Sequence, residues 1–173
     1  LRKKSGGFFG SGESTGSIGV VTINLPRIAY LSEDVEEFYR RLDKLMDIAA
    51  RSLKVKRDII TKLLEEGLYP YTKRYLGTFN NHFSTIGLIG MNEVGLNAKW
   101  LRKDMTHKET QEFAKDVLNH MRERLSDYQE LYGDLYNLEA TPAESTTYRF
   151  AKHDIKRYPD IITATEKGNK PYY

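Results

Sequence analysis

Three short apolar segments, separated by long amphipathic stretches, constrain the fold of this 173-residue chain most strongly. The segments cover residues 18–25, 84–90 and 135–140. Each has the length and the bounding turn residues that are typical of strands. Because helical stretches separate them, the strands are predicted to run parallel and to be joined by right-handed crossovers. The sequence therefore predicts an α/β fold.

The first segment is apolar on both faces, which is typical of an interior strand covered by helices. Pro26 follows it and is expected to close the strand with a turn. Ser32 is then predicted to cap a long amphipathic helix with an apolar stripe over 35–53. A second helical stretch, over 57–66, is predicted to stop at a glycine.

The second half of the chain contains the clearest helix signal. Thr106 and Glu109 match a capping box, in which each side chain satisfies a free backbone amide. Behind them an apolar stripe over 113–131 ends at Gly133. A last helix is predicted within 141–152. Residues 91–93, which include the polar pair Asn92 and Glu93, are expected at the carboxyl end of the second strand.

The composition limits the chemistry that these residues can carry. There is no cysteine, which excludes a disulfide framework, cysteine-ligated zinc, an iron–sulfur cluster and a cysteine nucleophile within the sequence. The four histidines are dispersed, with no two at a helical ligand spacing, so no metal site is expected. The net charge of +3 is a weak argument for nucleic acid, and we expect no nucleic-acid partner.

No apolar run approaches the roughly 20 residues of a membrane helix, and the amino-terminal residues lack the apolar segment of a signal peptide. We therefore expect a cytoplasmic protein without a membrane partner. The chain begins with leucine and ends on Tyr173 without a polar tail, which suggests an interior segment of a longer chain. Residues 1–16 are rich in glycine and are expected to form a loop.

Polar residues follow each predicted strand. These are Asn24, then Asn92 and Glu93, and finally the segment 141–146. The carboxyl ends of parallel strands share one edge of a sheet, where ligands gather, so these residues are expected to lie near one another. Free amides and hydroxyls in 141–146 suit a phosphate, but the same residues also suit an ordinary helix cap.

Three carboxylates, Glu93, Glu139 and Glu144, are expected near the same edge. Paired carboxylates can carry acid/base chemistry. Most carboxylates at strand ends bind backbone amides or solvent instead, which favours a structural role for these three.

Three motifs, at 19–29, 83–93 and 136–144, resemble the anaerobic (class III) ribonucleoside-triphosphate reductases in order and spacing. The resemblance extends over 1–173. It implies part of a ten-stranded glycyl-radical α/β barrel with parallel strands and long crossover helices. The chain would be an interior segment of one catalytic barrel domain, with a glycine-rich loop over 1–16, strand/helix units over 17–173, and both terminal parts of the parent chain missing.

The activity implied by the resemblance is the reduction of ribonucleoside triphosphates to deoxyribonucleoside triphosphates for DNA replication. In that family a radical-SAM activase installs a glycyl radical, which passes to a cysteine, and the thiyl radical removes the ribose 3′ hydrogen. The radical cysteine would precede Leu1, while the radical glycine and a zinc-binding region would follow Tyr173. The segment would therefore bind no cofactor and be inactive alone. The family also implies a homodimer and an allosteric ATP-binding region upstream.

By the same resemblance, one group of residues would lie near the ribose or support that site, and a second group would hold the phosphates. The first group is Ser17, Asn24, Asn92 and Glu93, and the second is Thr141, Pro142, Ala143, Glu144, Ser145 and Thr146. Some members have Asn near the position of Ser17, which goes with formate as reductant, so formate and a thiol protein both stay open. The alternatives to a reductase are a noncatalytic nucleotide-binding module and a helical interaction module.

Overall fold

A three-stranded parallel sheet organises the fold. The computed structural model describes residues 15–141, 144–165 and 170–173. The strands are β1 (Gly16–Asn24), β2 (His82–Ile89) and β3 (Tyr136–Ala140), in the order β1-β2-β3. Both neighbouring pairs are parallel. The predicted α/β fold with parallel strands is therefore confirmed.

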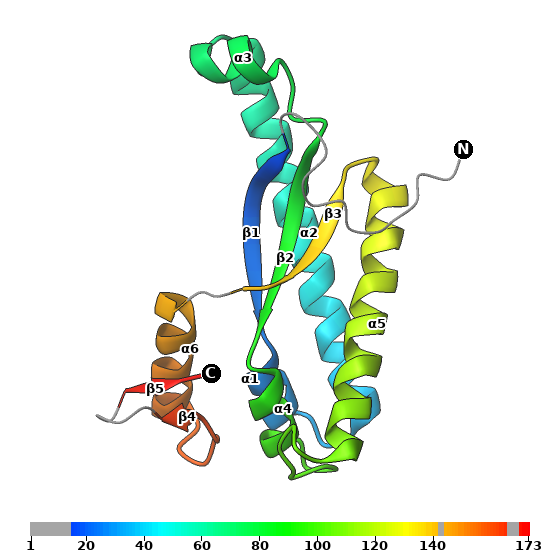
Figure 1. The fold of residues 1–173 in the computed structure, drawn as a ribbon, viewed down its shortest axis with the longest axis vertical. Coiled ribbons are helices and arrows are strands. Elements are labelled where there is room, and N and C mark those ends of the chain that lie inside the picture. Colours follow the sequence, from blue (N-terminus) through cyan, green and yellow to red (C-terminus); the bar gives the residue numbers. More distant parts are fainter. Residues whose placement is uncertain (1–14, 142–143, 166–169) are drawn as a thin grey trace.

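Six helices and one short antiparallel pair accompany this sheet in the described residues. The helices are α1 (Leu25–Leu31), α2 (Val35–Glu65), α3 (Pro70–Leu76), α4 (Met91–Asn97), α5 (Lys108–Tyr132) and α6 (Glu144–Arg157). The antiparallel pair is β4 (Ala164–Thr165) with β5 (Pro171–Tyr172). The long helices α2 and α5 run side by side along the sheet, while α6 lies beside the carboxyl ends of the strands (Figure 1).

The core lies between the sheet and the two long helices. Phe38, Leu42 and Met46 of α2 are fully buried, as is Ile86 of β2. Val117 and Met121 of α5 belong to the same cluster. Burying one such side chain contributes about 1.5–3 kcal/mol, so this apolar face holds the helices on the sheet.

The opposite face of the sheet is more polar. Ser17 Oγ lies 2.9 Å from Thr85 Oγ1. Val20, on the same strand as Ser17, is 46% exposed. The expectation that β1 is an interior strand covered on both faces is wrong for the described sheet, where β1 is an edge strand. β-Branched residues such as Thr22 suit a strand on either face, so their presence does not reveal which face is covered.

Pro26 does not close β1 with a turn. It lies in the first turn of α1, where its fixed φ and missing N–H suit a helix start. Asn24 caps this helix, because its Oδ1 accepts a hydrogen bond from the Arg27 amide over 3.2 Å. Ser32 was predicted to begin the next helix, but it ends α1, where its Oγ donates to the Ile28 carbonyl oxygen over 2.7 Å.

The cap of α2 is Asp34, whose Oδ1 accepts from the Glu37 amide over 2.8 Å. The two helical stretches predicted over 35–53 and 57–66 form this single helix. No proline or glycine interrupts residues 54–56, so nothing in the sequence breaks the backbone hydrogen bonding there. Gly67 follows the helix with a φ of +82°, a conformation common at helix ends, so the predicted stop at this glycine is confirmed.

The predicted capping box at Thr106 is wrong. His107 is the residue at the N-cap of α5, and it makes no side-chain capping bond. Thr106 Oγ1 instead donates to Asp104, and Glu109 accepts from Lys103 Nζ over 2.9 Å. The two side chains of the predicted capping box are therefore used in a local Asp–Thr turn and in an ion pair instead.

Of the remaining predictions about helices and loops, some are confirmed and others are wrong. α5 ends at Gly133 as predicted, and the glycine has a φ of +72°. Residues 91–93 begin α4 rather than ending β2. The aromatic and basic stretch after Gly67 contains α3, which the sequence did not indicate. The glycine-rich loop predicted over 1–16 lies mostly outside the described residues.

Candidate functional site

The carboxyl ends of the three strands meet at one edge of the sheet. Asn24 aligns with Ile89 at the ends of β1 and β2. Leu88 aligns with Ala140 of β3, and the amide of Thr141 donates to the Leu88 carbonyl oxygen over 3.2 Å. The polar residues that follow the strands therefore start from a common edge, as the parallel topology predicts.

A buried carboxylate on α6 joins three segments at this edge. Asp154 is 0% exposed and accepts hydrogen bonds from Asn24 Nδ2 over 2.8 Å and from Arg27 Nε over 2.6 Å. The hydroxyl of Tyr173 donates to the same carboxylate over 2.7 Å. A buried charge needs such partners, and here they come from the end of β1, from α1 and from the last described residue.

Asp154 was absent from the residues that the sequence analysis singled out. The spacing of Ala151 and Asp154 puts them on one face of α6, but only the folded structure shows that this face is buried. A carboxylate on the buried face of a helix points to a partner on another element.

Tyr173 lies close to Gly90, the residue after β2, and its hydroxyl reaches Asp154. Burial raises the pKa of its hydroxyl, and the hydrogen bond with Asp154 raises it further, so the group stays protonated and donates. Beside it, Gly90 has a φ of +76°, and a Cβ there would lie 2.3 Å from Pro26 Cγ and 3.2 Å from Tyr173 Cβ. Only glycine fits this position.

Glu93 is the buried carboxylate of α4, with 5% of the residue exposed. Its Oε1 accepts from Asn92 Nδ2 over 3.1 Å, and Asn92 Oδ1 accepts in turn from the Met105 amide over 3.1 Å. Within the described residues no hydrogen bond reaches the second oxygen of Glu93. This oxygen can accept a hydrogen bond from a ligand hydroxyl.

Gly87 lets the Thr141 side chain pack closely against the polar face of the sheet. A Cβ on this residue would lie 2.1 Å from Thr141 Oγ1 and 3.2 Å from Thr22 Oγ1. Thr141 Oγ1 is buried and has no hydrogen-bond partner in the described part of the chain. A buried hydroxyl without a partner costs about 1–3 kcal/mol, which a bound polar ligand can recover.

The family model of the anaerobic ribonucleoside-triphosphate reductase matches residues 2–173. The chain belongs to this family.

Two curated reductases of the family are similar over most of this chain. The anaerobic ribonucleoside-triphosphate reductase of Haemophilus influenzae is 30% identical over 167 residues, which cover 88% of this chain and 24% of the relative. The enzyme of Enterobacteria phage T4 is 28% identical over 171 residues, 88% of this chain and 26% of its own length. The chain thus spans about a quarter of the reductases it matches.

The fold agrees with a solved reductase. The crystal structure of the anaerobic ribonucleotide reductase from Thermotoga maritima with MES in the active site has a TM-score of 0.79 and 28% identity. The match covers 92% of this chain and 27% of that one. The α/β arrangement of this segment is therefore similar to part of that reductase.

Within this reductase segment the residues predicted for the ribose separate into two places. Ser17 is the second residue of β1 and Asn24 the last, so they lie toward opposite ends of the strand. Ser17 contacts Thr85, whereas Asn24 belongs to the edge with Asn92 and Glu93.

The predicted phosphate segment of the reductase is described in part. Pro142 and Ala143 lie outside the described residues. Glu144 is the first residue of α6, Ser145 is exposed and Thr146 is half-buried. Among the carboxylates considered with Glu93, Glu139 is exposed on β3.

No group of three or more His, Cys, Asp or Glu side chains in the described ranges could hold a metal ion. No helix in the same ranges has both the length and the apolar character for crossing a membrane.

Proposed function

We propose that this chain is part of an enzyme that reduces ribonucleoside triphosphates to deoxyribonucleoside triphosphates, and that it forms one side of the substrate site. The observation that carries this proposal is the shared strand edge, where Asn24, Glu93 and Thr141 follow three parallel strands in a chain of the reductase family. A sheet edge of this kind is where α/β folds bind their ligands.

The phosphates would lie at the start of α6. The first amides of a helix have no partner within the helix and carry the positive end of its dipole. Ser145 and Thr146 belong to this first turn, and Thr141 precedes it. Pro142, Ala143 and Glu144 complete the proposed phosphate segment. The unpartnered hydroxyl of Thr141 supports a ligand here better than the capping alternative does, because a cap would already use that hydroxyl.

The ribose would lie near Glu93. Its buried carboxylate has a free oxygen that can accept from a ribose hydroxyl, and Asn92 orients it. Asn24 acts differently, since its Oδ1 caps α1 and its Nδ2 binds Asp154. We infer that Asn24 supports the strand edge. Ser17 lies on the polar face of the sheet and would be farther from the phosphates.

The proposed enzyme would need groups that this chain lacks. The radical glycine and its radical-SAM activase, a radical cysteine and the zinc-binding region would belong to the rest of a homodimeric enzyme with a ten-stranded barrel and an allosteric ATP-binding region. When present, the cysteine radical would supply hydrogen abstraction at the ribose. The 2′ hydroxyl would leave as water, and two electrons from formate or a thiol protein, with two protons, would complete its replacement by hydrogen. The residues of this chain would bind and orient the substrate.

The test is kinetic and uses a complete reductase that carries this chain. Replacing Thr141 and Ser145 by Ala should lower kcat/KM for the ribonucleoside triphosphate by at least about tenfold, because each lost hydrogen bond to a charged group costs about 1.5–3 kcal/mol. Ser126→Ala, on the exposed face of α5, is the matched control and should leave kcat/KM unchanged. Equal kinetics in the double variant and the control would refute the phosphate role.

A noncatalytic nucleotide-binding module is the second candidate, and the same unpartnered Thr141 hydroxyl would serve it. Assay of the complete protein for deoxyribonucleotide formation separates the two. Binding of triphosphate without any deoxyribonucleotide product after activation favours the noncatalytic module.

A further inference from the structure

A basic groove lies next to the strand edge, between α1 and α6. Its volume is about 580 Å³, and it is lined by Arg27, Arg149, Phe150, His153, Lys156 and Arg157. The groove is shallow and largely open to solvent. The groove is distinct from the start of α6, because its lining residues come from the middle and the carboxyl-terminal half of that helix.

Three of the cations that line the groove lack carboxylate partners in the described residues, whereas Arg27 pairs with Asp154 of α6. Arg149, Lys156 and Arg157 are exposed, and no carboxylate of the described residues lies within ion-pair distance of them. The guanidinium of Arg149 lies over the Phe150 ring, and that of Arg157 over the Tyr158 ring, at 5.7 and 5.6 Å from the ring centres. These aromatic contacts orient the guanidinium groups without neutralising them.

Helix electrostatics explain only part of this cluster. Lys156 and Arg157 lie in the last turn of α6, where cations stabilise the helix dipole. Arg149 lies about two turns earlier, so the dipole does not account for it, and Arg27 comes from another helix and is paired with Asp154. Several positive charges facing one groove repel one another, and a multivalent anion relieves that repulsion.

We propose that this groove binds a polyphosphate anion of the kind carried by nucleoside triphosphates, at a site separate from the substrate phosphates. Arginine forks match phosphate oxygens in pairs, and lysine adds a compact charge. Phe150 is half-buried in the wall and offers an apolar surface beside the charges. Arg27 also pairs with Asp154, so an anion in the groove is linked through one side chain to the strand edge.

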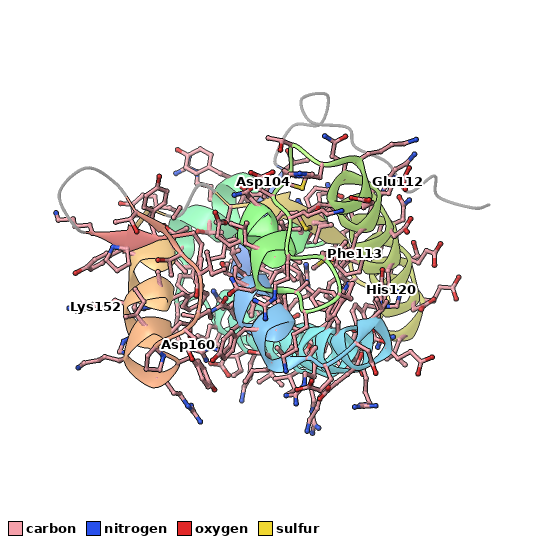
Figure 2. All side chains as sticks on the ribbon, turned by 90° about the horizontal axis from the view of Figure 1, so that it is seen from below. Asp104, Glu112, Phe113, His120, Lys152 and Asp160 are labelled. Carbon is pink, nitrogen blue, oxygen red and sulfur yellow. The ribbon has the colours of Figure 1, made fainter. Side chains whose placement is uncertain are left out.

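The test measures the acetylation rate of individual lysines in a complete reductase that carries this chain, with inorganic tripolyphosphate as the probe. Lys156 lines the groove, whereas Lys152 lies on the outer side of α6 against Tyr148 and is the matched internal control (Figure 2). Tripolyphosphate at about 1 mM, a concentration suited to a modest site, should slow acetylation of Lys156 at least about fivefold and leave Lys152 unchanged.

Two further measurements identify which part of a nucleotide binds and whether it binds in the groove. If ATP protects Lys156 from acetylation at a lower concentration than tripolyphosphate does, the base also contacts the groove at Phe150. If both protect at the same concentration, the phosphates alone bind. Both results support the proposal. Protection of Lys156 should persist when Thr141 and Ser145 are replaced by Ala. Loss of protection in that variant would overturn the proposal, because the groove would then belong to the substrate site.

A groove variant completes the design. Arg149→Gln should raise the tripolyphosphate concentration for half-protection of Lys156 by about tenfold, as expected for one lost phosphate contact. An unchanged Lys152 rate in this variant verifies that α6 is intact. Slowing of Lys152 together with Lys156, equal protection by sulfate at the same ionic strength, or no protection of the wild-type enzyme would each overturn the proposal. The readout is independent of turnover, so failure here is distinguishable from failure of the reductase assignment.

Discussion

Asn24 Nδ2 donates a hydrogen bond to the buried carboxylate of Asp154 over 2.8 Å, and this contact joins the end of β1 to α6. The two residues are 130 positions apart in the chain. Since the same carboxylate also binds Arg27 and Tyr173, the edge of the proposed substrate site depends on one buried charge and its partners.

Asp154→Asn should destabilise the protein by about 2–3 kcal/mol. The change keeps the shape of the side chain but removes the charge that pairs with Arg27 and accepts from Tyr173. Asp160→Asn is the control, because Asp160 is exposed and makes no ion pair in the described residues, and it should change stability by less than about 0.5 kcal/mol. Thermal unfolding of both variants compares them. Equal melting temperatures would remove Asp154 from its structural role.

Gly87→Ala should impair both stability and nucleotide binding. The added methyl would lie 2.1 Å from Thr141 Oγ1, and overpacking of this kind costs about 1–3 kcal/mol. In the double variant with Thr141→Ala the closest contact is gone, so stability should recover by more than half while binding stays weak. Thermal unfolding and calorimetric titration with a ribonucleoside triphosphate measure the two effects. Full recovery of binding in the double variant would contradict a ligand contact at Thr141.

His82 should make the protein sensitive to mild acid. Burial lowers the pKa of its ring from the usual 6.5, and the nearby Arg57 lowers it further. As the pH falls below about 6.5, the unfolded chain therefore takes up a proton that the folded chain does not, and stability falls. Above that pH this contribution is constant.

The measurement for His82 is the free energy of unfolding between pH 8 and pH 5, a range that brackets the usual pKa of histidine. His82→Gln should flatten the acid side of this curve, whereas His153→Gln, at an exposed position, should keep the wild-type slope. Identical slopes for wild type and His82→Gln would show that other groups cause the acid sensitivity.

Two leucines of α2 test how this helix packs. Leu42 is 0% exposed against the sheet and Leu45 is 41% exposed. Leu42→Ala should cost about 2–5 kcal/mol because it leaves a cavity in the core, while Leu45→Ala should cost under about 1 kcal/mol. Urea unfolding of the two variants gives the comparison. Similar losses for both would mean that the exposed face of α2 is also packed in the protein.

Much of the fold could be predicted because its signals are local. The glycines after α2 and α5 and the three apolar segments each report a backbone preference or a buried face, as does the apolar stripe of α2 except at Val35 and Leu45, which are exposed. The errors lie where two local rules compete. Pro26 suits both a strand end and a helix start, and Thr106 binds Asp104 rather than closing the capping box.

The candidate site could be predicted only by position along the strands. The parallel order implies that Asn24, Glu93 and Thr141 start from one edge, and the structure agrees. The sequence could not reveal that Asn24 is committed to Asp154, because that contact requires α6 to fold back to the end of β1.

The sequence by itself determined the alternation of strands and helices, the parallel direction that follows from it, and the family motifs, since all of these depend on residues close together in the chain. The tertiary structure alone decided which carboxylate is buried, which hydroxyl lacks a partner, and that Arg27 meets the basic face of α6. The physical reason is that burial and charge pairing are properties of the whole packed arrangement, set by segments distant in sequence, whereas periodicity and capping are encoded within a few residues.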